Sequence, residues 1–246
     1  MIWHAQLDRD GYVLVQNVYS EGEVRRAIAQ LSICLQQLPP SSASVRSRNG
    51  FVYALRNLLD LFPEAKAIWK QSPLPELLRA TLGEKAGLVR GLYFDKPPER
   101  SWSLPWHKDL AIAVRNNRLL SSSFRNPTQK AGVAHIEAPR FVLESMLTLR
   151  IHLDDTTKEN GALRVLPGSH RIEASEDKCE GAGKLIVANA GDVLAMRPLL
   201  SHCSGTSHPE TQRQRRIIHL EFAANRRLPD DFEWSYFQPL DASDET

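Results

Sequence analysis

The alternation of hydrophobic and polar positions divides the chain into a mainly helical first part and a strand-rich remainder. Near the start, "GYVLVQNV" predicts a short strand, and "YSEGEVRRAIAQLSICLQQL" after it predicts a helix. Ser20 and Glu23 have the spacing of a capping box, which places the start of that helix. Further helical structure is predicted within residues 51–70, interrupted at Pro63, and over "LPELLRATLG", which ends on a glycine.

Short apolar runs separated by Gly, Pro and Asn follow residue 87, and they predict strands. The predicted strands are "LVRGLYFDKPP", "SMLTLRIHLDD", "ALRVL", "KLIVAN", "DVLAMR" and "RRIIHLEFA". The second and third are expected to pair through "TTKENG", because Asn160-Gly161 is a strong tight-turn signal. Helices followed by many short strands predict a mainly β fold, a jelly roll whose N-terminal helices pack on one sheet.

The length allows one large β domain, and we expect a single domain over residues 1–246. A helical prefix is expected over residues 1–87 and a jelly-roll core over 88–225, with a long lid loop at 110–146. Four basic residues precede the first acidic residue of that loop: Arg115, Arg118, Arg125 and Lys130. This surplus of positive charge fits either a solvated face or a lid that binds an anionic substrate.

The composition excludes several classes of function. Hydrophobic residues make up 42% of the chain, and 31 Lys and Arg against 29 Asp and Glu give a net charge of +2. This balance provides no electrostatic basis for nucleic acid or a membrane as the main partner, and no apolar run has membrane length. The three cysteines lack paired metal-site spacing, which argues against a disulfide framework and favours a reducing, cytoplasmic location.

The stretch "PWHKDL" contains the first candidate for metal chemistry. Because alternate residues of a strand point to the same side, His107 and Asp109 can present a nitrogen and a carboxylate to one point. The candidate for a third ligand is His202 in "RPLLSHCSG", expected at the end of the apolar strand that starts near Asp192. Two histidines and one carboxylate on an octahedral iron(II) leave three positions for a keto acid and dioxygen.

A second pair, His152 and Asp154 in "RIHLDD", is a rival, because strand alternation places both on the same side as Arg150. Other histidines carry lower weight as ligands: His135, His170 and His208 in loops or turns, and His219, which is expected to line the site.

An arginine could hold the far carboxylate of a dicarboxylate bound to the metal. The "RRIIHLEF" strand is expected next to the strand that ends at His202, which brings its arginines within reach. Arg213 and Arg215 share one face of that strand, whereas Arg216 faces the opposite side. A planar guanidinium pairs with carboxylate through two hydrogen bonds and stays charged when buried.

Six fragments together resemble the phytanoyl-CoA dioxygenase-like family of iron(II)- and 2-oxoglutarate-dependent oxygenases. They are "DRDGYVLVQNVYSEGEV", "YFDKPP", "WHKDL", "ENGALRVLPGSHR", "AGDVLAMRPLLSHCSG" and "RRIIHLEFA", which span nearly the whole chain in order. The resemblance implies a double-stranded β-helix with iron ligands at His107, Asp109 and His202. The carboxylate at position 109 is replaced by a small residue in related halogenases, so its presence here favours hydroxylation.

The same resemblance implies residues that contact 2-oxoglutarate. Counting back from "HLEFA" assigns the cosubstrate arginine to Arg215, whereas counting forward from His202 assigns it to Arg213. Further contacts transfer to Leu92, Arg150 and Ser204.

The expected function is an iron(II)- and 2-oxoglutarate-dependent dioxygenase that hydroxylates or otherwise oxidises a small organic substrate with dioxygen. Its products besides the oxidised substrate are succinate and carbon dioxide. Two alternatives stay open: a catalytically silent jelly roll that binds a small molecule, and a cupin-like metalloenzyme that uses no keto acid.

Overall fold

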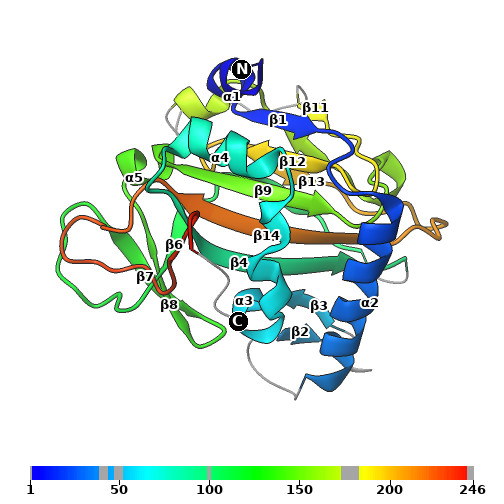
Figure 1. Ribbon diagram of the computed structural model, residues 1–246, viewed down its shortest axis with the longest axis horizontal. Helices are drawn as coiled ribbons and strands as arrows, with labels where there is room; N and C mark the ends of the chain where they lie inside the picture. The colour runs from blue at the N-terminus through cyan, green and yellow to red at the C-terminus, as the bar shows by residue number, and fades with distance from the viewer. Residues whose placement is uncertain (1, 39–43, 47–51, 99–100, 173–182, 243–246) are drawn as a thin grey trace.

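Two antiparallel sheets face each other across the interior, and helices cover the outer face of the larger one (Figure 1). The computed structural model describes residues 2–38, 44–46, 52–98, 101–172 and 183–242. Its helices are α1 (Ile2–Asp10), α2 (Glu21–Gln37), α3 (Leu58–Leu61), α4 (Leu74–Leu82) and α5 (Arg140–Glu144), with 3-10 turns at Pro63–Lys66, Ile68–Lys70, Lys158–Asn160 and Ser169–Arg171. No helix in these ranges is long and apolar enough to cross a membrane.

The larger sheet has the order β1-β12-β9-β14-β4-β3-β2, with β15 also paired to β4. Its strands are β1 (Tyr12–Val15), β2 (Ser44–Arg46), β3 (Val52–Leu55), β4 (Gly87–Lys96), β9 (Met146–His152), β12 (Val193–Met196), β14 (Arg215–Ala223) and β15 (Gln238–Pro239). The expected strands at "GYVLVQNV", "DVLAMR" and "RRIIHLEFA" are thereby confirmed. Val52–Leu55 was expected to be helical and is a strand, because its four buried residues extend the sheet beside β4.

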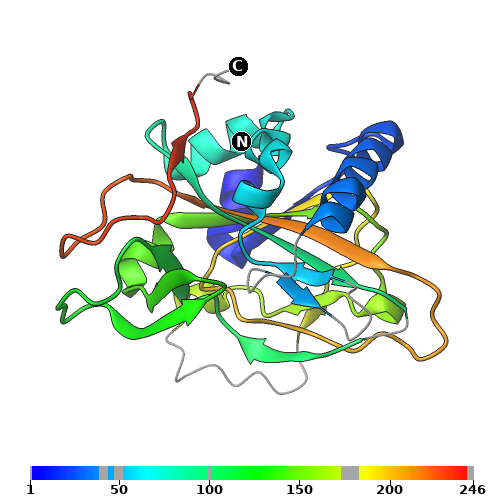
Figure 2. The same cartoon turned by 90° about the horizontal axis from the view of Figure 1, so that it is seen from below.

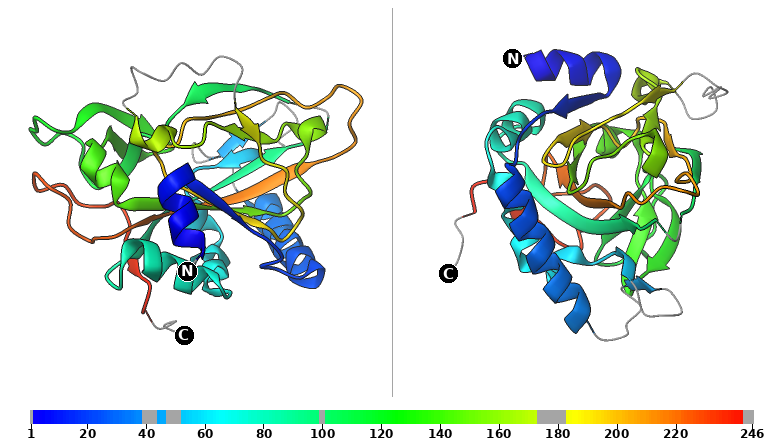
Figure 3. Two further views of the ribbon diagram at one scale, coloured as in Figure 1. Left: turned by 90° about the horizontal axis from the view of Figure 1, so that it is seen from above. Right: turned by 90° about the vertical axis from the view of Figure 1, so that its right-hand side faces the viewer.

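The smaller sheet has the order β11-β10-β13-β5 and lies on the opposite side of the interior. Its strands are β5 (Leu104–His107), β10 (Leu163–Val165), β11 (Lys184–Leu185) and β13 (His202–Ser204). The end-on view in Figure 3 shows the two sheets as a flattened barrel, with α2 running along its outside. This is the jelly roll with packed N-terminal helices that the sequence predicts.

Alternation along β9 separates the two faces of the larger sheet. Leu147, Leu149 and Ile151 point outward into the apolar cluster formed with α2, α3 and α4. Burying an aliphatic side chain of this size contributes roughly 1.5–3 kcal/mol. The intervening Arg150 and His152 are also buried but point into the barrel, so the inner face is available for polar chemistry. The predicted capping box is present at the start of α2, where Ser20 and Glu23 bond each other reciprocally.

The expected pairing of "SMLTLRIHLDD" with "ALRVL" is wrong. The first forms β9 in the larger sheet, and the second forms β10 in the smaller one. Asn160 ends a 3-10 turn whose first residues are capped by Thr157, and Gly161 follows in the left-handed conformation with φ of 74°. The Asn-Gly signal therefore marks a crossing between sheets and not a hairpin.

The segment expected as a long lid loop is a third sheet with the order β6-β8-β7. Its strands are β6 (Ala111–Val114), β7 (Arg125–Lys130) and β8 (Val133–Glu137). Figure 2 shows this green sheet projecting from the barrel beside the orange-red segment that follows β14. Trp234 of that segment packs in one apolar cluster with Ile112 and Ile136, so the projection has a core of its own.

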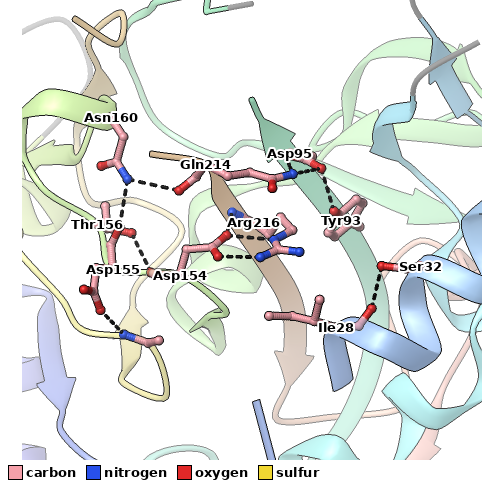
Figure 4. A network of polar contacts seen from close by, with 11 residues as sticks. Ile28, Ser32, Tyr93, Asp95, Asp154, Asp155, Thr156, Asn160, Gln214 and Arg216 are labelled. Atoms are coloured by element: carbon pink, nitrogen blue, oxygen red, sulfur yellow. Dashed lines mark hydrogen bonds and ion pairs between the residues drawn. The ribbon is translucent and has the colours of Figure 1, made fainter. Parts of the chain in front are cut away.

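Asp95 lies in a polar network on the outer face of the larger sheet (Figure 4). Its carboxylate accepts hydrogen bonds from the Tyr93 hydroxyl and the Gln214 amide, both at 2.9 Å. Burial raises the pKa of Asp95 to about 6, although both hydrogen bonds oppose the shift. Between roughly pH 4, the unfolded value, and pH 6, the folded state holds a proton that the unfolded chain has released. The stability of the protein should therefore fall as the pH rises through this window.

We expect Asp95→Asn to raise the free energy of unfolding at pH 8 by on the order of 2 kcal/mol, because the amide can keep both contacts without burying a charge. The same substitution should flatten the pH dependence between about pH 4 and pH 6. Denaturant unfolding of both proteins at pH 5 and pH 8 measures this. If the free energy of unfolding depended on pH identically in the two proteins, the buried Asp95 charge would have no effect on stability.

Candidate metal centre and cosubstrate pocket

Three side chains with metal-binding atoms meet at one edge of the smaller sheet. His107 ends β5 and is paired in register with His202, which begins β13. Asp109 follows two residues later, and its amide donates to the carbonyl of Pro198 at 2.9 Å, which ties it to the turn before β13. One ligand atom from each residue lies within 4.8 Å of the other two. The closest approaches to the Asp109 carboxylate are 3.9 Å from His107 Nε2 and 3.7 Å from His202 Nε2.

Hydrogen bonds on the far side of each ring fix how the two imidazoles are presented. His107 Nδ1 donates to the Pro105 carbonyl and His202 Nδ1 donates to the Leu200 carbonyl, each at 2.8 Å. Because a carbonyl accepts only, both Nδ1 atoms carry a proton, and both Nε2 atoms face Asp109. This backbone support is how metal-binding histidines are usually oriented.

The protonation of this group also suits a cation. Burial lowers the pKa of His202 to about 4, so its ring is neutral at pH 7. Burial disfavours the charged form of Asp109, yet its electrostatic interactions with His202 and other neighbours, Arg150 among them, hold the pKa of Asp109 below its usual range. Two imidazoles and one carboxylate are the donor set of mononuclear iron oxygenases, so the residues fit iron(II).

A cavity of about 370 Å³ adjoins the three residues and extends between the sheets. All the expected cosubstrate residues line it: Leu92, Arg150, Ser204 and Arg215, together with His219. Lining residues that the sequence did not suggest include Arg56, Arg90, Phe94, Trp102, Glu137 and Glu221. Of these, Arg90, Phe94 and Glu221 were within reach of sequence reasoning, because they share strand parity with Leu92 or His219.

Arg215 is the first residue of β14 and is only 5% exposed. Its Nε has no hydrogen-bond partner among the described residues, and the same holds for the Ser204 hydroxyl. Burial, reinforced by Arg150, lowers the pKa of Arg215 to about 9, which still leaves it charged at pH 7. A buried cation without a carboxylate is costly, so this position fits an anionic ligand.

The other two arginines of "RQRRII" point elsewhere. Arg213 lies in the preceding loop with a side chain 54% exposed, 3.5 Å from Glu159. Arg216 faces the outer side and donates to both carboxylate oxygens of Asp154, at 2.9 and 2.6 Å (Figure 4). The expected division of these residues by strand parity is therefore observed, and Arg215 lines the cavity whereas Arg213 and Arg216 do not.

The rival pair His152 and Asp154 does not form a metal site. Asp154 was expected on the same side as Arg150, but it lies beyond the end of β9 and is turned outward to Arg216. His152 stays inside, where its Nδ1 contacts the Thr156 hydroxyl at 2.9 Å. Within the described ranges, the one group with metal-like spacing is His107, Asp109 and His202.

His202 was expected at the end of the strand that starts near Asp192, beside the strand of Arg215. That placement is wrong, because β12 ends at Met196 and His202 begins the next strand, in the opposite sheet. Arg215 reaches the same cavity from across the barrel. The residues meet as expected, but through facing sheets instead of neighbouring strands.

A row of polar side chains connects the two ends of the inner face. Arg150 Nη1 donates to His219 Nδ1 at 3.0 Å, which places the His219 proton on Nε2. That atom lies 3.4 Å from Glu221, whose carboxylate also accepts from Arg90 at 3.2 Å. His219 thus lines the site without joining the metal group, as expected. Glu221 is the link that the sequence reasoning missed.

Comparison with known proteins agrees with the geometry. Residues 7–216 match the sequence profile of the family described as phytanoyl-CoA dioxygenase (PhyH). The chain belongs to this family. The expected class, an iron(II)- and 2-oxoglutarate-dependent dioxygenase, is confirmed by that membership together with the donor set.

Individual relatives of this PhyH-family dioxygenase are distant. A protein of Stutzerimonas stutzeri named as a probable alpha-ketoglutarate-dependent hypophosphite dioxygenase is 23% identical over 254 residues, covering 89% of this chain and 77% of that protein. The crystal structure of EctD from S. alaskensis with 2-oxoglutarate and 5-hydroxyectoine has a TM-score of 0.67 at 20% identity, covering 92% and 77% of the two chains. EvdMO1 has a TM-score of 0.62 at 23% identity, and this chain spans about half of its length (90% and 49% covered). These likenesses confirm the fold.

Proposed function

We propose that His107, Asp109 and His202 hold one iron(II) ion and that the enzyme uses it to oxidise a small anionic organic substrate. The observation that carries the assignment is the convergence of two Nε2 atoms and one carboxylate within 4.8 Å at the cavity wall. Iron(II) with 2-oxoglutarate and dioxygen supplies the oxidation of substrate coupled to release of succinate and carbon dioxide. Asp109 occupies the position that halogenases leave small, which favours hydroxylation or a related oxidation.

Arg215 is proposed to bind the far carboxylate of 2-oxoglutarate, since its buried fork faces the cavity without a carboxylate of its own. The Ser204 hydroxyl is placed to donate to the same ligand, and Leu92 supplies an apolar wall. Arg150 is held by His219 and adds positive charge next to Asp109. Together these residues orient the cosubstrate and exclude water, which protects the reaction from side products.

The substrate is proposed to be small, because the cavity of about 370 Å³ must also house the cosubstrate and lies at the lower end of the roughly 300–1,000 Å³ typical of ligand pockets. An anion is favoured by the basic lining and by the name of the hypophosphite dioxygenase relative, whose substrate is an anion. We also infer a single oxygenase domain over residues 1–246, since strands from the prefix complete the larger sheet. Cys34 is a free thiol, which supports the proposed cytoplasmic location, and Cys179 lies outside the described residues.

Oxygen-dependent release of succinate from 2-oxoglutarate by the iron-loaded protein tests this proposal against its rivals. We expect release that requires both iron and dioxygen. A silent binding protein would release none. A cupin-like metalloenzyme would act on its substrate equally well without 2-oxoglutarate, so neither of these outcomes is compatible with the proposed function.

A further inference from the structure

Three basic side chains gather at the end of the cavity away from Arg215. Arg90 lies on the same inner face of β4 as Lys96, the residue paired in register with Arg215. Arg90 and Lys96 are six positions apart, which corresponds to roughly 20 Å along a strand. Leu92 and Phe94 line the cavity between them. The basic groups at the two ends of this row are therefore separate, and each can serve a different anion.

Arg56 and Lys130 reach this end of the cavity from outside the barrel strands. Lys130 ends β7, and Arg56 lies in the loop after β3. The Asn57 amide donates to the Ala131 carbonyl at 3.4 Å, which holds the loop of Arg56 against the turn that follows Lys130. The third sheet thus contributes one of its basic residues to the cavity wall.

These cations lack enough carboxylate partners of their own. Arg90 pairs with Glu221 at 3.2 Å, but no carboxylate of the described chain lies within 4 Å of Arg56 or Lys130. Burial lowers the pKa of Lys130, and the nearby Arg90 and Arg56 lower it further. Like charges crowded in a partly buried site are unfavourable unless an anion joins them.

The charge of the whole cavity points the same way. Its lining contains Arg56, Arg90, Lys130, Arg150 and Arg215 against the carboxylates of Asp109, Glu137 and Glu221. Lys108 also borders it, but its ammonium donates to the carbonyls of Ser169 and Ile172. Because the two charges of iron(II) and those of 2-oxoglutarate cancel, a positive surplus remains for the substrate.

We propose that Arg56, Arg90 and Lys130 form a second anion site, which binds the acidic group of the primary substrate. This inference rests on the proposed oxygenase function and extends it to the substrate class: a small molecule bearing a carboxylate or a tetrahedral oxyanion such as a phosphonate. Guanidinium forks and an ammonium suit both kinds of oxygen acceptor.

Arg56→Gln and Lys130→Gln test the site, with Arg125→Gln as the matched control. Arg125 lies on the same strand as Lys130 but is exposed and does not line the cavity, so its variant loses equal charge outside it. Arg90 is not substituted, because its removal would leave the buried Glu221 carboxylate without its arginine partner. The probes are methylphosphonate, propionate and uncharged propionamide, titrated calorimetrically into anaerobic protein loaded with iron(II) and 2-oxoglutarate.

We expect at least one acidic probe to bind the wild type and the control at least about tenfold more tightly than it binds either variant. Propionamide should not distinguish the proteins, and the better acidic probe identifies carboxylate or phosphonate as the preferred group. Affinity for 2-oxoglutarate should stay within about threefold in all four proteins. Equal binding of both acidic probes by the wild type and both variants, including no binding by any of them, would overturn the second anion site. Failure of the wild type to bind 2-oxoglutarate would instead count against the proposed function.

Discussion

Replacing His202 by alanine is expected to abolish turnover and to weaken iron binding by more than about 100-fold. Removing a residue that only hydrogen-bonds to a metal ligand already weakens binding by roughly 10–100-fold, and the loss of a ligand itself should exceed that. His202 is 3% exposed, and its Nε2 is one of the three donors that the described part of the chain brings to the site. The two remaining donors would hold the ion poorly against water. Iron retained after desalting, measured by metal analysis, gives the result directly.

His152→Ala is the matched control for this prediction. His152 is a buried histidine on the inner face of the same barrel, but its ring contacts Thr156 and lies outside the metal group. Its loss should leave the iron content unchanged. Loss of iron from His152→Ala together with retention in His202→Ala would move the metal to the rival pair.

Replacing Arg215 by alanine is expected to weaken 2-oxoglutarate binding by roughly 2–4 kcal/mol, the scale for removing one partner of a desolvated, hydrogen-bonded charge pair. The guanidinium is 5% exposed and has no carboxylate partner in the described chain, so the dicarboxylate is the group that would satisfy it. Arg215→Lys should recover only part of the loss, because a point charge cannot reproduce the planar fork. Titration of 2-oxoglutarate under saturating iron measures each affinity.

Arg213→Ala and Arg216→Ala separate the competing assignments. Both remove the same charge within two residues of Arg215, but one side chain is exposed in a loop and the other pairs with Asp154 on the outer face. Each should change the affinity for 2-oxoglutarate by less than about threefold, or under roughly 1 kcal/mol. A large loss of 2-oxoglutarate affinity confined to Arg213→Ala would show that counting forward from His202 gives the correct cosubstrate arginine.

Strand parity allowed much of the cavity wall to be predicted. β14 is regular from Arg215 to Glu221, so its alternation assigned Arg215 and His219 to the interior and Arg216 to the outside. The same alternation failed at Asp154, because β9 ends at His152 and the chain turns before it. Parity holds only while a strand continues, and the sequence did not reveal where this strand ends.

The pairing of strands was harder to predict from the sequence. In this jelly roll consecutive strands pass between two sheets, so β9 and β10 follow each other in the chain without pairing. A turn signal such as Asn160-Gly161 describes local backbone geometry and is the same in a hairpin and in a crossing. For the same reason His202 was placed in the wrong sheet, although its neighbours in space were right.

The third sheet and the second anion site were hidden for different reasons. β7 is an exposed strand without an apolar face, so no hydrophobic alternation marks it. In the turn after it, Gly132 at φ of 78° is a turn-forming residue type, but Ala131 at φ of 52° is not, so the tight-turn signal is incomplete. Arg56, Arg90 and Lys130 come from three separate segments, and their proximity depends on how those segments fold together.

The most direct test of the central claim is an anaerobic titration of 2-oxoglutarate into the iron(II)-loaded protein, followed by visible absorption. Chelation of iron by the keto acid produces a charge-transfer band. The wild type should develop this band to saturation, Arg215→Ala should need a higher concentration of 2-oxoglutarate, and His202→Ala should develop none. A wild-type protein that binds iron and 2-oxoglutarate without the band, or a His202→Ala protein with an unchanged band, would contradict a metal centre at His107, Asp109 and His202.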